Sequence, residues 1–370
     1  MLNRTVFLVV CFVLLFGVQS YSAETIKIGV PGAHSGDLAS YGLPTIKAVE
    51  LVVKEINAGG GVNGRQVEIY AEDDACKPEV ATNAATKLVS MKVDAIVGHI
   101  CSGATKAAMG IYKNANLVAI SPSATNPELT QSGDYPNFFR TIASDDLQAS
   151  TQVDFILNNL KLTKIAVVHD KQDYGKGLAE FAKQFIEKSG RAQVVLFEGV
   201  TSGAVDYSAI VQKIKRSKAE IVLYGGYHPE ASKIITQMRK KKMKTLFISG
   251  DGVKADTFIK VAAQNAEGIY ATGQADTSQN SVMIKAKNDL KKVYGEDPGN
   301  FFENAYSAAL ALLNAIDKAD STDYDKLVHA LRSEYVETPV GKISFDKHGD
   351  AIGVGFSVYQ VRNSAFVEVK

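Results

Sequence analysis

The chain has 370 residues, a length that usually divides into about two domains. Hydrophobic residues make up 46% and charged residues 22%, with no low-complexity segment, so a disordered or fibrous protein is excluded. The 41 Lys and Arg residues nearly balance the 40 Asp and Glu residues, which argues against a surface that binds nucleic acid.

The amino-terminal segment has the pattern of an export signal. Arg4 is the one charged residue before Glu24, and the run Val6–Val18 is apolar throughout. A signal-peptide core needs roughly 7–15 apolar residues, whereas a bilayer-spanning helix needs about 20, so an uncleaved membrane anchor is the poorer interpretation. We therefore expect a signal peptide over residues 1–23 and a soluble, exported mature protein.

Small residues after the apolar run offer two cleavage points. Cleavage after Ser22 satisfies the small-x-small rule, whereas cleavage after Ala23 places the bulky Tyr21 at the −3 position. A lipoprotein anchor on Cys11 is rejected because that cysteine lies inside the apolar run, directly behind Val10.

The mature chain then keeps two cysteines, Cys76 and Cys101, each directly after a strand-like run. An even pair in an oxidising compartment predicts a disulfide bond, and two parallel strands of one sheet would bring the pair within reach. A reactive thiol is the alternative interpretation, with nearby His99 as its one candidate partner.

Short β-branched runs alternate with stretches of helical spacing along the rest of the chain. Strands are predicted at Ile26–Val30, Val67–Ala71, Ala95–Val97, Val118–Ile120, Ile165–Val168, Val194–Phe197, Ile221–Tyr224, Leu246–Ile248 and Ile269–Ala271. Between these runs, apolar residues recur at spacings of three and four, as at Ala48, Leu51 and Val52, which indicates helices. This alternation is typical of open parallel sheets covered by helices, and the chain is long enough for two of them.

The alternation changes in three places. It breaks near Thr141–Leu147, where we predict a domain boundary, and a long helix is predicted at Asn300–Lys318. The closing runs Gly355–Val361 and Phe366–Val369 are predicted to add antiparallel strands to a sheet instead of another strand–helix–strand unit.

No enzyme signature keeps the structural context that it requires. Gly59, Gly61 and Gly64 have the spacing of a dinucleotide-binding loop, yet they end a helical stretch and lead into a strand, the reverse of that loop. Asp73 and Asp74 are interpreted as a polar turn at a strand end instead of an acid–base pair. The sequence therefore predicts no catalytic residue and no cofactor.

The histidines show no spacing that would hold a metal ion, and no metal site is predicted. Each is interpreted as a turn or surface residue: His34, His99, His169, His228, His329 and His348.

Hydroxyl side chains follow two strands that are consecutive in the chain. Ser102 comes after one strand and begins a helix predicted at Ala104–Tyr112, while Ser123 and Thr125 follow the next strand. A hydroxyl beside the free N–H groups of a helix N-terminus can bind a carboxylate, although a lone serine there is more often a helix cap. Because ligands bind at neighbouring strand ends of open α/β sheets, the two clusters together indicate a ligand site.

Five runs resemble the periplasmic leucine/isoleucine/valine-binding proteins, which are type I substrate-binding proteins of ABC importers. They are DDAC (73–76), GHICS (98–102), SPSATNPEL (121–129), VVHDKQDYGKGLA (167–179) and YGGYHPE (224–230). The resemblance covers essentially the whole mature chain. It implies an α/β, type I periplasmic binding protein fold, with two doubly wound lobes, a three-strand hinge and ligand in the cleft.

The same resemblance implies how the chain divides and pairs. One lobe would comprise residues 24–143 and 274–352, and the other would comprise residues 144–273 and 353–370. The disulfide of the family falls on Cys76 and Cys101, in agreement with the compartment argument.

Ligand contacts also transfer by this resemblance. Ser102 and Thr125 would bind the α-carboxylate, Thr125 and Asp251 would bind the α-ammonium, and Ser123 would contribute main-chain atoms. The resemblance also implies Glu at the position where this chain has Asp251, which is one methylene shorter. Residues that would line the side-chain pocket are Tyr41, Ile100, Cys101, Tyr174, Tyr227, Gly252 and Phe301, although the FF pair at 301–302 permits two alignments.

The expected protein is thus a monomer in the periplasm that captures branched-chain or similar aliphatic L-amino acids. It would deliver them to the permease subunits of an ABC importer in the inner membrane. Two alternatives stay open: the same fold binding another small solute such as alanine, proline or a short amide, or an exported hydrolase with an activated nucleophile.

Overall fold

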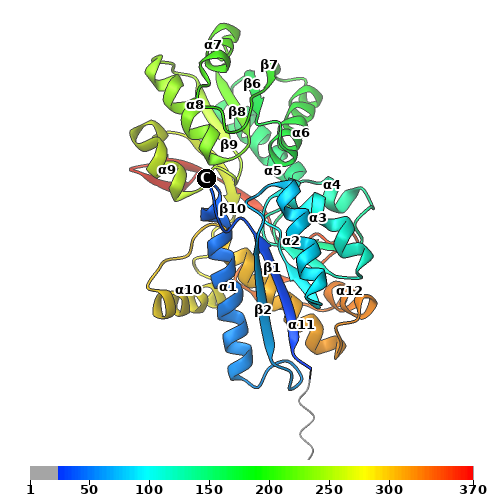
Figure 1. The fold of residues 1–370 in the computed structure, drawn as a ribbon. Helices are drawn as coiled ribbons and strands as arrows, with labels where there is room; N and C mark the ends of the chain where they lie inside the picture. The colour runs from blue at the N-terminus through cyan, green and yellow to red at the C-terminus, as the bar shows by residue number, and fades with distance from the viewer. Residues whose placement is uncertain (1–23, 370) are drawn as a thin grey trace, which may run out of the picture.

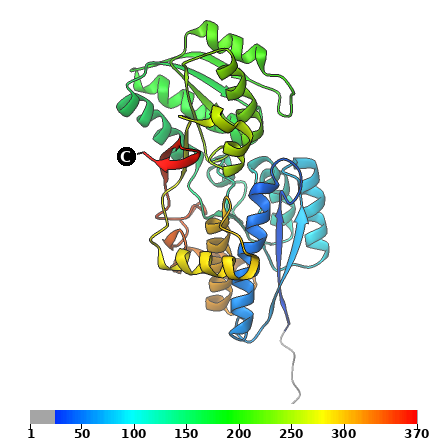
Figure 2. The ribbon, with the colours of Figure 1, turned by 90° about the vertical axis from the view of Figure 1, so that its left-hand side faces the viewer.

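The computed structural model in Figure 1 describes residues 24–369 of the chain. The predicted signal peptide and its cleavage point lie outside these residues. Two α/β lobes are stacked one on the other, as the two perpendicular views of Figures 1 and 2 show. The predicted fold class, two doubly wound lobes, is confirmed. No helix within residues 24–369 is long and apolar enough to cross a membrane.

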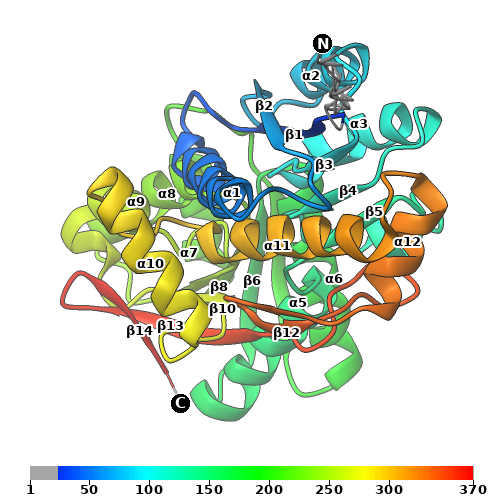
Figure 3. The same ribbon diagram turned by 90° about the horizontal axis from the view of Figure 1, so that it is seen from below.

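The first lobe is built on a parallel five-stranded sheet with the order β2-β1-β3-β4-β5. Its strands are β1 (Ile26–Gly32), β2 (Val67–Asp73), β3 (Ala95–Val97), β4 (Ala119–Ser121) and β5 (Phe138–Arg140). Its helices are α1 (Ala39–Ala58), α2 (Pro78–Ser90), α3 (Ser102–Asn114), α4 (Glu128–Gln131), α10 (Ser281–Tyr294), α11 (Phe302–Ala319) and α12 (Tyr324–Ser333). Helices α1 and α11 contact each other beside the sheet (Figure 3). Helices α2 and α3 form a second contacting pair, which also packs against the sheet.

The second lobe is built on a seven-stranded sheet with the order β14-β13-β10-β9-β8-β6-β7. Its strands are β6 (Lys164–His169), β7 (Gln193–Gly199), β8 (Ile221–Gly225), β9 (Leu246–Ser249), β10 (Tyr270–Gln274), β13 (Phe356–Arg362) and β14 (Ala365–Glu368). Its helices are α5 (Asp145–Asp154), a π-helix (Phe155–Leu160), α6 (Asp173–Ser189), α7 (Ser208–Ser217), α8 (His228–Lys240), α9 (Asp256–Ala262) and a 3₁₀ turn (Ala263–Ala266). Strands β6 to β10 are mutually parallel, whereas β13 and β14 are antiparallel additions, as predicted.

Each predicted strand coincides with or overlaps an observed one, because a strand covered by helices on both faces is apolar throughout and is recognisable from its residues alone. Strand β8 is buried along its whole length. The sequence analysis missed β5 and the hairpin of β11 (Val336–Thr338) and β12 (Gly341–Ile343), each only three residues long. Such short strands are stabilised by their neighbours in the sheet and carry no periodicity of their own.

The glycines that mimic a nucleotide-binding loop form the turn between α1 and β2. Helix α1 ends at Ala58, and Gly60 and Gly61 adopt positive φ angles of 102° and 84°. A Cβ atom at Gly61 would lie 2.0 Å from the carbonyl oxygen of Arg65, so only glycine fits this turn. The helix-end interpretation of these glycines is confirmed.

The chain passes between the two sheets three times. It leaves the first sheet between β5 and α5, returns between β10 and α10, and leaves again between β12 and β13. These three segments lie side by side at the waist of the molecule (Figures 1 and 2). Motion of one lobe against the other therefore has to pass through these connections.

A disulfide bond joins the loops that follow β2 and β3, the two strands that flank β1. Cys76 and Cys101 have their Cα atoms 5.5 Å apart, within the ordinary range for a disulfide. The predicted pairing is confirmed, and the reactive-thiol alternative is wrong because neither sulfur is free.

We expect mature protein from an oxidising compartment to show no thiol in denaturant until a reductant is added. Replacing Cys76 and Cys101 by serine should lower the free energy of unfolding by about 3.5 kcal/mol, because the unfolded chain regains the entropy of the closed loop. Thiol titration and urea unfolding measure the two effects. Two reactive thiols in the unreduced protein would contradict the pairing.

Candidate functional site

A narrow cavity lies between the lobes, where strand ends of both sheets meet. Its volume is about 10 Å³. Its walls are formed by Tyr41, Ile100, Cys101, Ser123, Tyr174, Tyr227, Asp251, Gly252 and Phe301. All nine were among the eleven residues predicted from the sequence. They come from segments of both lobes.

The remaining two predicted residues lie buried next to this cavity. Ser102 is the first residue of α3, and its Oγ accepts a hydrogen bond from the Asn126 N–H at 3.3 Å. Thr125 is wholly buried, and its side chain lies next to the Asp145 carboxyl. Ser102 directly follows Cys101 of the cavity wall, and Thr125 lies shortly after Ser123.

Aromatic rings form most of the apolar surface of the cavity. The ring centroids of Tyr41 and Phe301 are 5.6 Å apart, and those of Tyr174 and Tyr227 are 5.1 Å apart. Phe302, the other candidate in the FF pair, packs into the core of the first lobe instead. The structure thus places Phe301 at the cavity.

Tyr41 connects the two lobes across the cavity. Its hydroxyl donates to the carbonyl oxygen of Gly252 at 2.6 Å and lies 2.7 Å from His228 Nδ1. Because the one proton of the Tyr41 hydroxyl is donated to the Gly252 carbonyl, the hydroxyl oxygen accepts a hydrogen bond from Nδ1 of His228. Burial lowers the pKa of His228 to about 4, so the ring is neutral at neutral pH. The surface interpretation of His228 is wrong.

Asp251 supplies a buried carboxyl group from the second lobe, just after β9. Its Oδ1 accepts hydrogen bonds from Gln148 Nε2 at 2.9 Å and from the Tyr174 hydroxyl at 2.8 Å. Burial raises the pKa of Asp251, and the hydrogen bonds from Gln148 and Tyr174 oppose that rise. The carboxyl group is therefore held in one orientation at the cavity wall.

Three buried groups behind the disulfide fix the loop that carries Ile100. His99 Nδ1 lies 2.6 Å from Asp74 Oδ2, and His99 Nε2 lies 2.9 Å from the Tyr112 hydroxyl. Asp74 also accepts the N–H of Cys76 at 2.7 Å. The sequence interpretation of His99 as a turn or surface residue is wrong, because its ring is completely buried between these partners.

His169 is also buried, with 7% of its surface exposed. Asp73, by contrast, behaves as expected: its Oδ1 accepts the backbone N–H groups of His34, Ser35 and Ala75. These bonds form the polar turn that was predicted at the end of β2.

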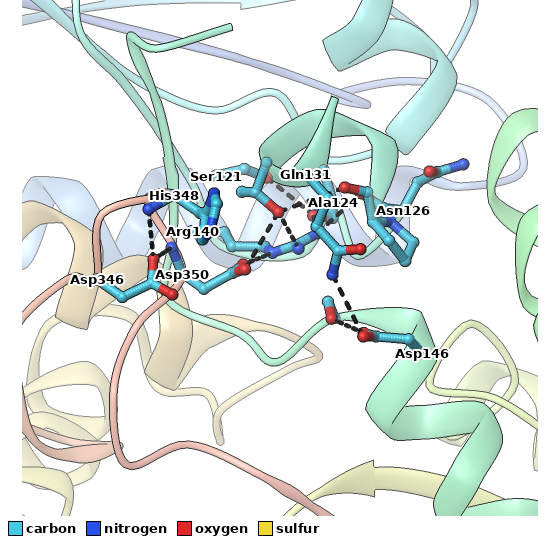
Figure 4. Close-up of polar contacts among 12 residues, drawn as sticks. Ser121, Ala124, Asn126, Gln131, Arg140, Asp146, Asp346, His348 and Asp350 are labelled. Atoms are coloured by element: carbon cyan, nitrogen blue, oxygen red, sulfur yellow. Dashed lines mark hydrogen bonds and ion pairs between the residues drawn. The ribbon is translucent and has the colours of Figure 1, made fainter. Parts of the chain in front are cut away.

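Arg140, at the end of β5, holds the loop between β4 and α4 (Figure 4). It is fully buried, and its guanidinium pairs through Nε with Asp350. It also donates to the Asn126 carbonyl at 2.9 Å and to the Thr130 hydroxyl at 2.7 Å. This loop contains Thr125 and follows Ser123 of the cavity wall, so the Arg140–Asp350 pair helps to fix that side of the cavity.

The sequence analysis missed three polar residues of the site: Asp145, Gln148 and His228. The first two lie in or directly after the segment that was interpreted only as a domain boundary. Asp145 and Gln148 lie on one buried face of α5, a pattern that the sequence does contain. The sequence does not show which residues of other segments that face contacts. Within residues 24–369, no group of three or more His, Cys, Asp or Glu residues could hold a metal ion.

Comparison with known proteins places this geometry in context. The family described as periplasmic binding protein matches residues 25–365. The leucine-, isoleucine-, valine-, threonine- and alanine-binding protein of Pseudomonas aeruginosa is 37% identical over 95% of this chain and 93% of its own length. The Leu/Ile/Val-binding protein of Escherichia coli K12 is 36% identical over 94% of each chain.

Two solved structures are similar over nearly the whole chain. A leucine-binding protein from Thermotoga maritima has a TM-score of 0.87 at 26% identity, covering 94% of this chain and 98% of its own. A branched-chain amino acid transporter substrate-binding protein from Streptococcus pneumoniae, solved with isoleucine, has a TM-score of 0.82 at 29% identity, with coverages of 93% and 100%.

We expect His99→Phe to lower the free energy of unfolding by about 3–5 kcal/mol, because it leaves the carboxyl of Asp74 buried without its ring partner. Tyr112→Phe is the matched control, since it removes only one hydroxyl and should cost about 1 kcal/mol. Urea unfolding followed by circular dichroism gives both values. Equal, small losses for the two variants would contradict the anchoring role of His99.

Proposed function

The chain belongs to the periplasmic binding protein family, and we propose that it captures leucine, isoleucine, valine or a similar aliphatic amino acid. The observation that carries this proposal is the cavity itself. It combines an aromatic and aliphatic lining with one fixed carboxyl group, and hydroxyl groups lie beside it on the opposite lobe. A free aliphatic amino acid has an apolar side chain, an ammonium group and a carboxylate group, which match these three features in turn.

The charged end of the ligand is proposed to lie between Ser102, Thr125 and Asp251. The hydroxyls, with the N–H groups at the start of α3, would bind the α-carboxylate, as at other helix N-termini. Asp251 would bind the α-ammonium through charge-assisted hydrogen bonds, with Thr125 as a further acceptor. The Thr125 hydroxyl is buried beside the Asp145 carboxyl, which supports a polar end of the site in this place.

The side chain of the ligand is proposed to lie among Tyr41, Tyr227, Phe301 and Ile100. These side chains present no charge to it, which favours an aliphatic ligand over a charged one. One methylene group in an apolar pocket changes the binding free energy by only about 1–3 kcal/mol, so leucine, isoleucine and valine should all bind.

Ligand capture is proposed to require hinge motion between lobes comprising 24–143 with 274–352 and 144–273 with 353–370. Residues of both lobes line the cavity, so the lobes would have to separate for an amino acid to enter it. Bonds such as Asn300 Nδ2 to the Lys254 carbonyl, 2.9 Å long, join the proposed lobes and would break on opening. The permease subunits of an ABC importer would recognise the closed form, as in other hinge-type switches.

No catalysis is proposed at this site. Ser123, the serine on the cavity wall, donates to the Ile100 carbonyl at 2.7 Å, which cannot act as a general base. Cys101 is held in the disulfide. The proposed protein is therefore a monomeric carrier in the periplasm that releases its ligand unchanged.

A calorimetric screen of the twenty amino acids tests the function. We expect leucine, isoleucine and valine to bind one per chain and to be recovered unchanged, and charged amino acids to give no signal. Binding of alanine, proline or a short amide without the branched-chain amino acids would contradict the proposed ligand class. Consumption of the ligand would contradict the carrier role.

Asp251→Ala should weaken leucine binding by about 2–5 kcal/mol, because the ammonium loses its buried counter-charge, which is roughly 30- to 5000-fold in Kd. Asp251→Glu is the control, since it keeps the negative charge and should retain binding. Titration calorimetry and thermal unfolding of both variants make the measurement. If Asp251→Ala lowers the melting temperature while leucine affinity stays within about threefold, the carboxyl is a structural turn residue instead.

A further inference from the structure

The second lobe carries a strongly basic surface at the edge of its sheet opposite the cavity. Tyr227 follows β8 and Asp251 follows β9, so the carboxyl ends of these strands face the cavity. Helices α6, α7 and α8 run back from that end, and the connections from them to the next strand therefore lie at the opposite edge. This edge belongs to the part of the molecule that lies away from the first lobe (Figure 1).

Four segments of the chain lie side by side along this edge. They lead into β6, β7, β8 and β9, which are neighbours in the sheet and pair with one another from their first or second residue. We call the four segments the basic edge: KLTK (161–164), EKSGRAQ (187–193), KRSKAE (215–220) and KKKMKT (240–245).

The basic edge holds eleven basic residues and two acidic ones. All eleven basic residues are exposed, and none of them forms an ion pair in the described part of the chain. Glu187 lies 3.9 Å from Lys183 on its own helix. Glu220 accepts the backbone N–H groups of Thr163 and Lys164. Because the whole chain has a formal net charge of +1, the rest of the chain is net negative.

Helix geometry alone does not account for this charge. Basic side chains are favoured in the last turn of a helix, where they complement the helix dipole. Counting only the connections between helix and strand, the basic edge still holds six basic residues and one acid. The matching connections of the first lobe follow helices with the same dipole, yet they hold two basic and two acidic residues: 59–66, 91–94, 115–118 and 132–137.

The composition of the basic edge favours one kind of anionic partner. Nine of its eleven basic residues are lysine, a flexible point charge, whereas arginine is the residue that recognises single phosphates through two parallel hydrogen bonds. None of the four segments contains an aromatic residue on which a nucleic-acid base could stack. A broad lysine surface without such rings fits an extended surface of negative charge, and a bilayer with anionic headgroups is such a surface.

We propose that the basic edge is a docking surface for bilayers that contain anionic phospholipid. Each lysine near such a bilayer strengthens binding by about fivefold, and the lipid charges offset the mutual repulsion of the like charges on the edge. The cavity lies at the other end of the second lobe, and the first lobe takes no part in the contact. The protein can therefore open and close while it is docked, whichever solute the cavity binds.

Vesicle sedimentation with the mature protein tests this proposal. The mature protein lacks the apolar run Val6–Val18, which would itself contact lipid. We expect binding at low salt to vesicles of phosphatidylglycerol and phosphatidylcholine in equal parts, and no binding to vesicles of phosphatidylcholine alone. The binding should be lost at about 1 M salt, where the Debye length falls to about 3 Å.

Replacing three lysines of the basic edge together should weaken vesicle binding by roughly 100-fold, at about fivefold per lysine: Lys240→Gln, Lys241→Gln and Lys244→Gln. The matched control replaces three exposed lysines of the first lobe, which changes the net charge equally and should leave vesicle binding within about twofold: Lys54→Gln, Lys326→Gln and Lys347→Gln. Circular dichroism establishes that both variants fold.

Three results would overturn the proposal. Absence of binding to the anionic vesicles at low salt makes the basic edge a solvated surface. Equal losses in the two triple variants assign the binding to net charge instead of this edge. Duplex DNA that binds more tightly than the vesicles assigns the edge to another anionic partner. Amino-acid capture stands or falls separately, because calorimetry with leucine measures it without vesicles.

Discussion

Burial of carboxyl groups between the two lobes is the constraint on which the rest of this site depends. A carboxylate removed from water is stable only when a cation, a proton or several donors compensate it. Asp251 has two donors, Gln148 and Tyr174, from its own lobe, and Asp145 has the Thr125 hydroxyl and the charge of Arg140. The ammonium group of the proposed ligand would add to this compensation when the lobes close.

The first lobe is built to keep its half of the site rigid. The loop after β3 is fixed by the disulfide and by the Asp74–His99 pair, and the loop after β4 is fixed by Arg140. The Ser121 and Ser123 hydroxyls also donate to backbone carbonyls of the loop after β3. Loops that are ordered before binding cost less conformational entropy when the ligand arrives. The motion needed for capture is then left to the three connections between the lobes.

The family resemblance implies glutamate at position 251, and the aspartate of this chain is one methylene shorter, so its carboxyl group lies closer to its own backbone. The hydrogen bonds from Gln148 and Tyr174 hold it at the cavity wall. The hydroxyl of Tyr41, on the first lobe, donates to the carbonyl of Gly252. This hydrogen bond holds the backbone next to Asp251 close to the first lobe. A shorter acid can therefore remain at the wall without a change in the surrounding fold.

The sequence alone determined the alternation of buried strands and helices, the antiparallel ending and the pairing of Cys76 with Cys101, because these depend on local periodicity and on cysteine count. Family resemblance supplied the residues that surround the cavity. Only the tertiary structure decided that His99 and His228 are buried and that Gln148 and Tyr174 donate to Asp251. Burial and charge proximity arise from residues far apart in the chain, and no local pattern of apolar and polar residues encodes which two of them the folded lobes bring together.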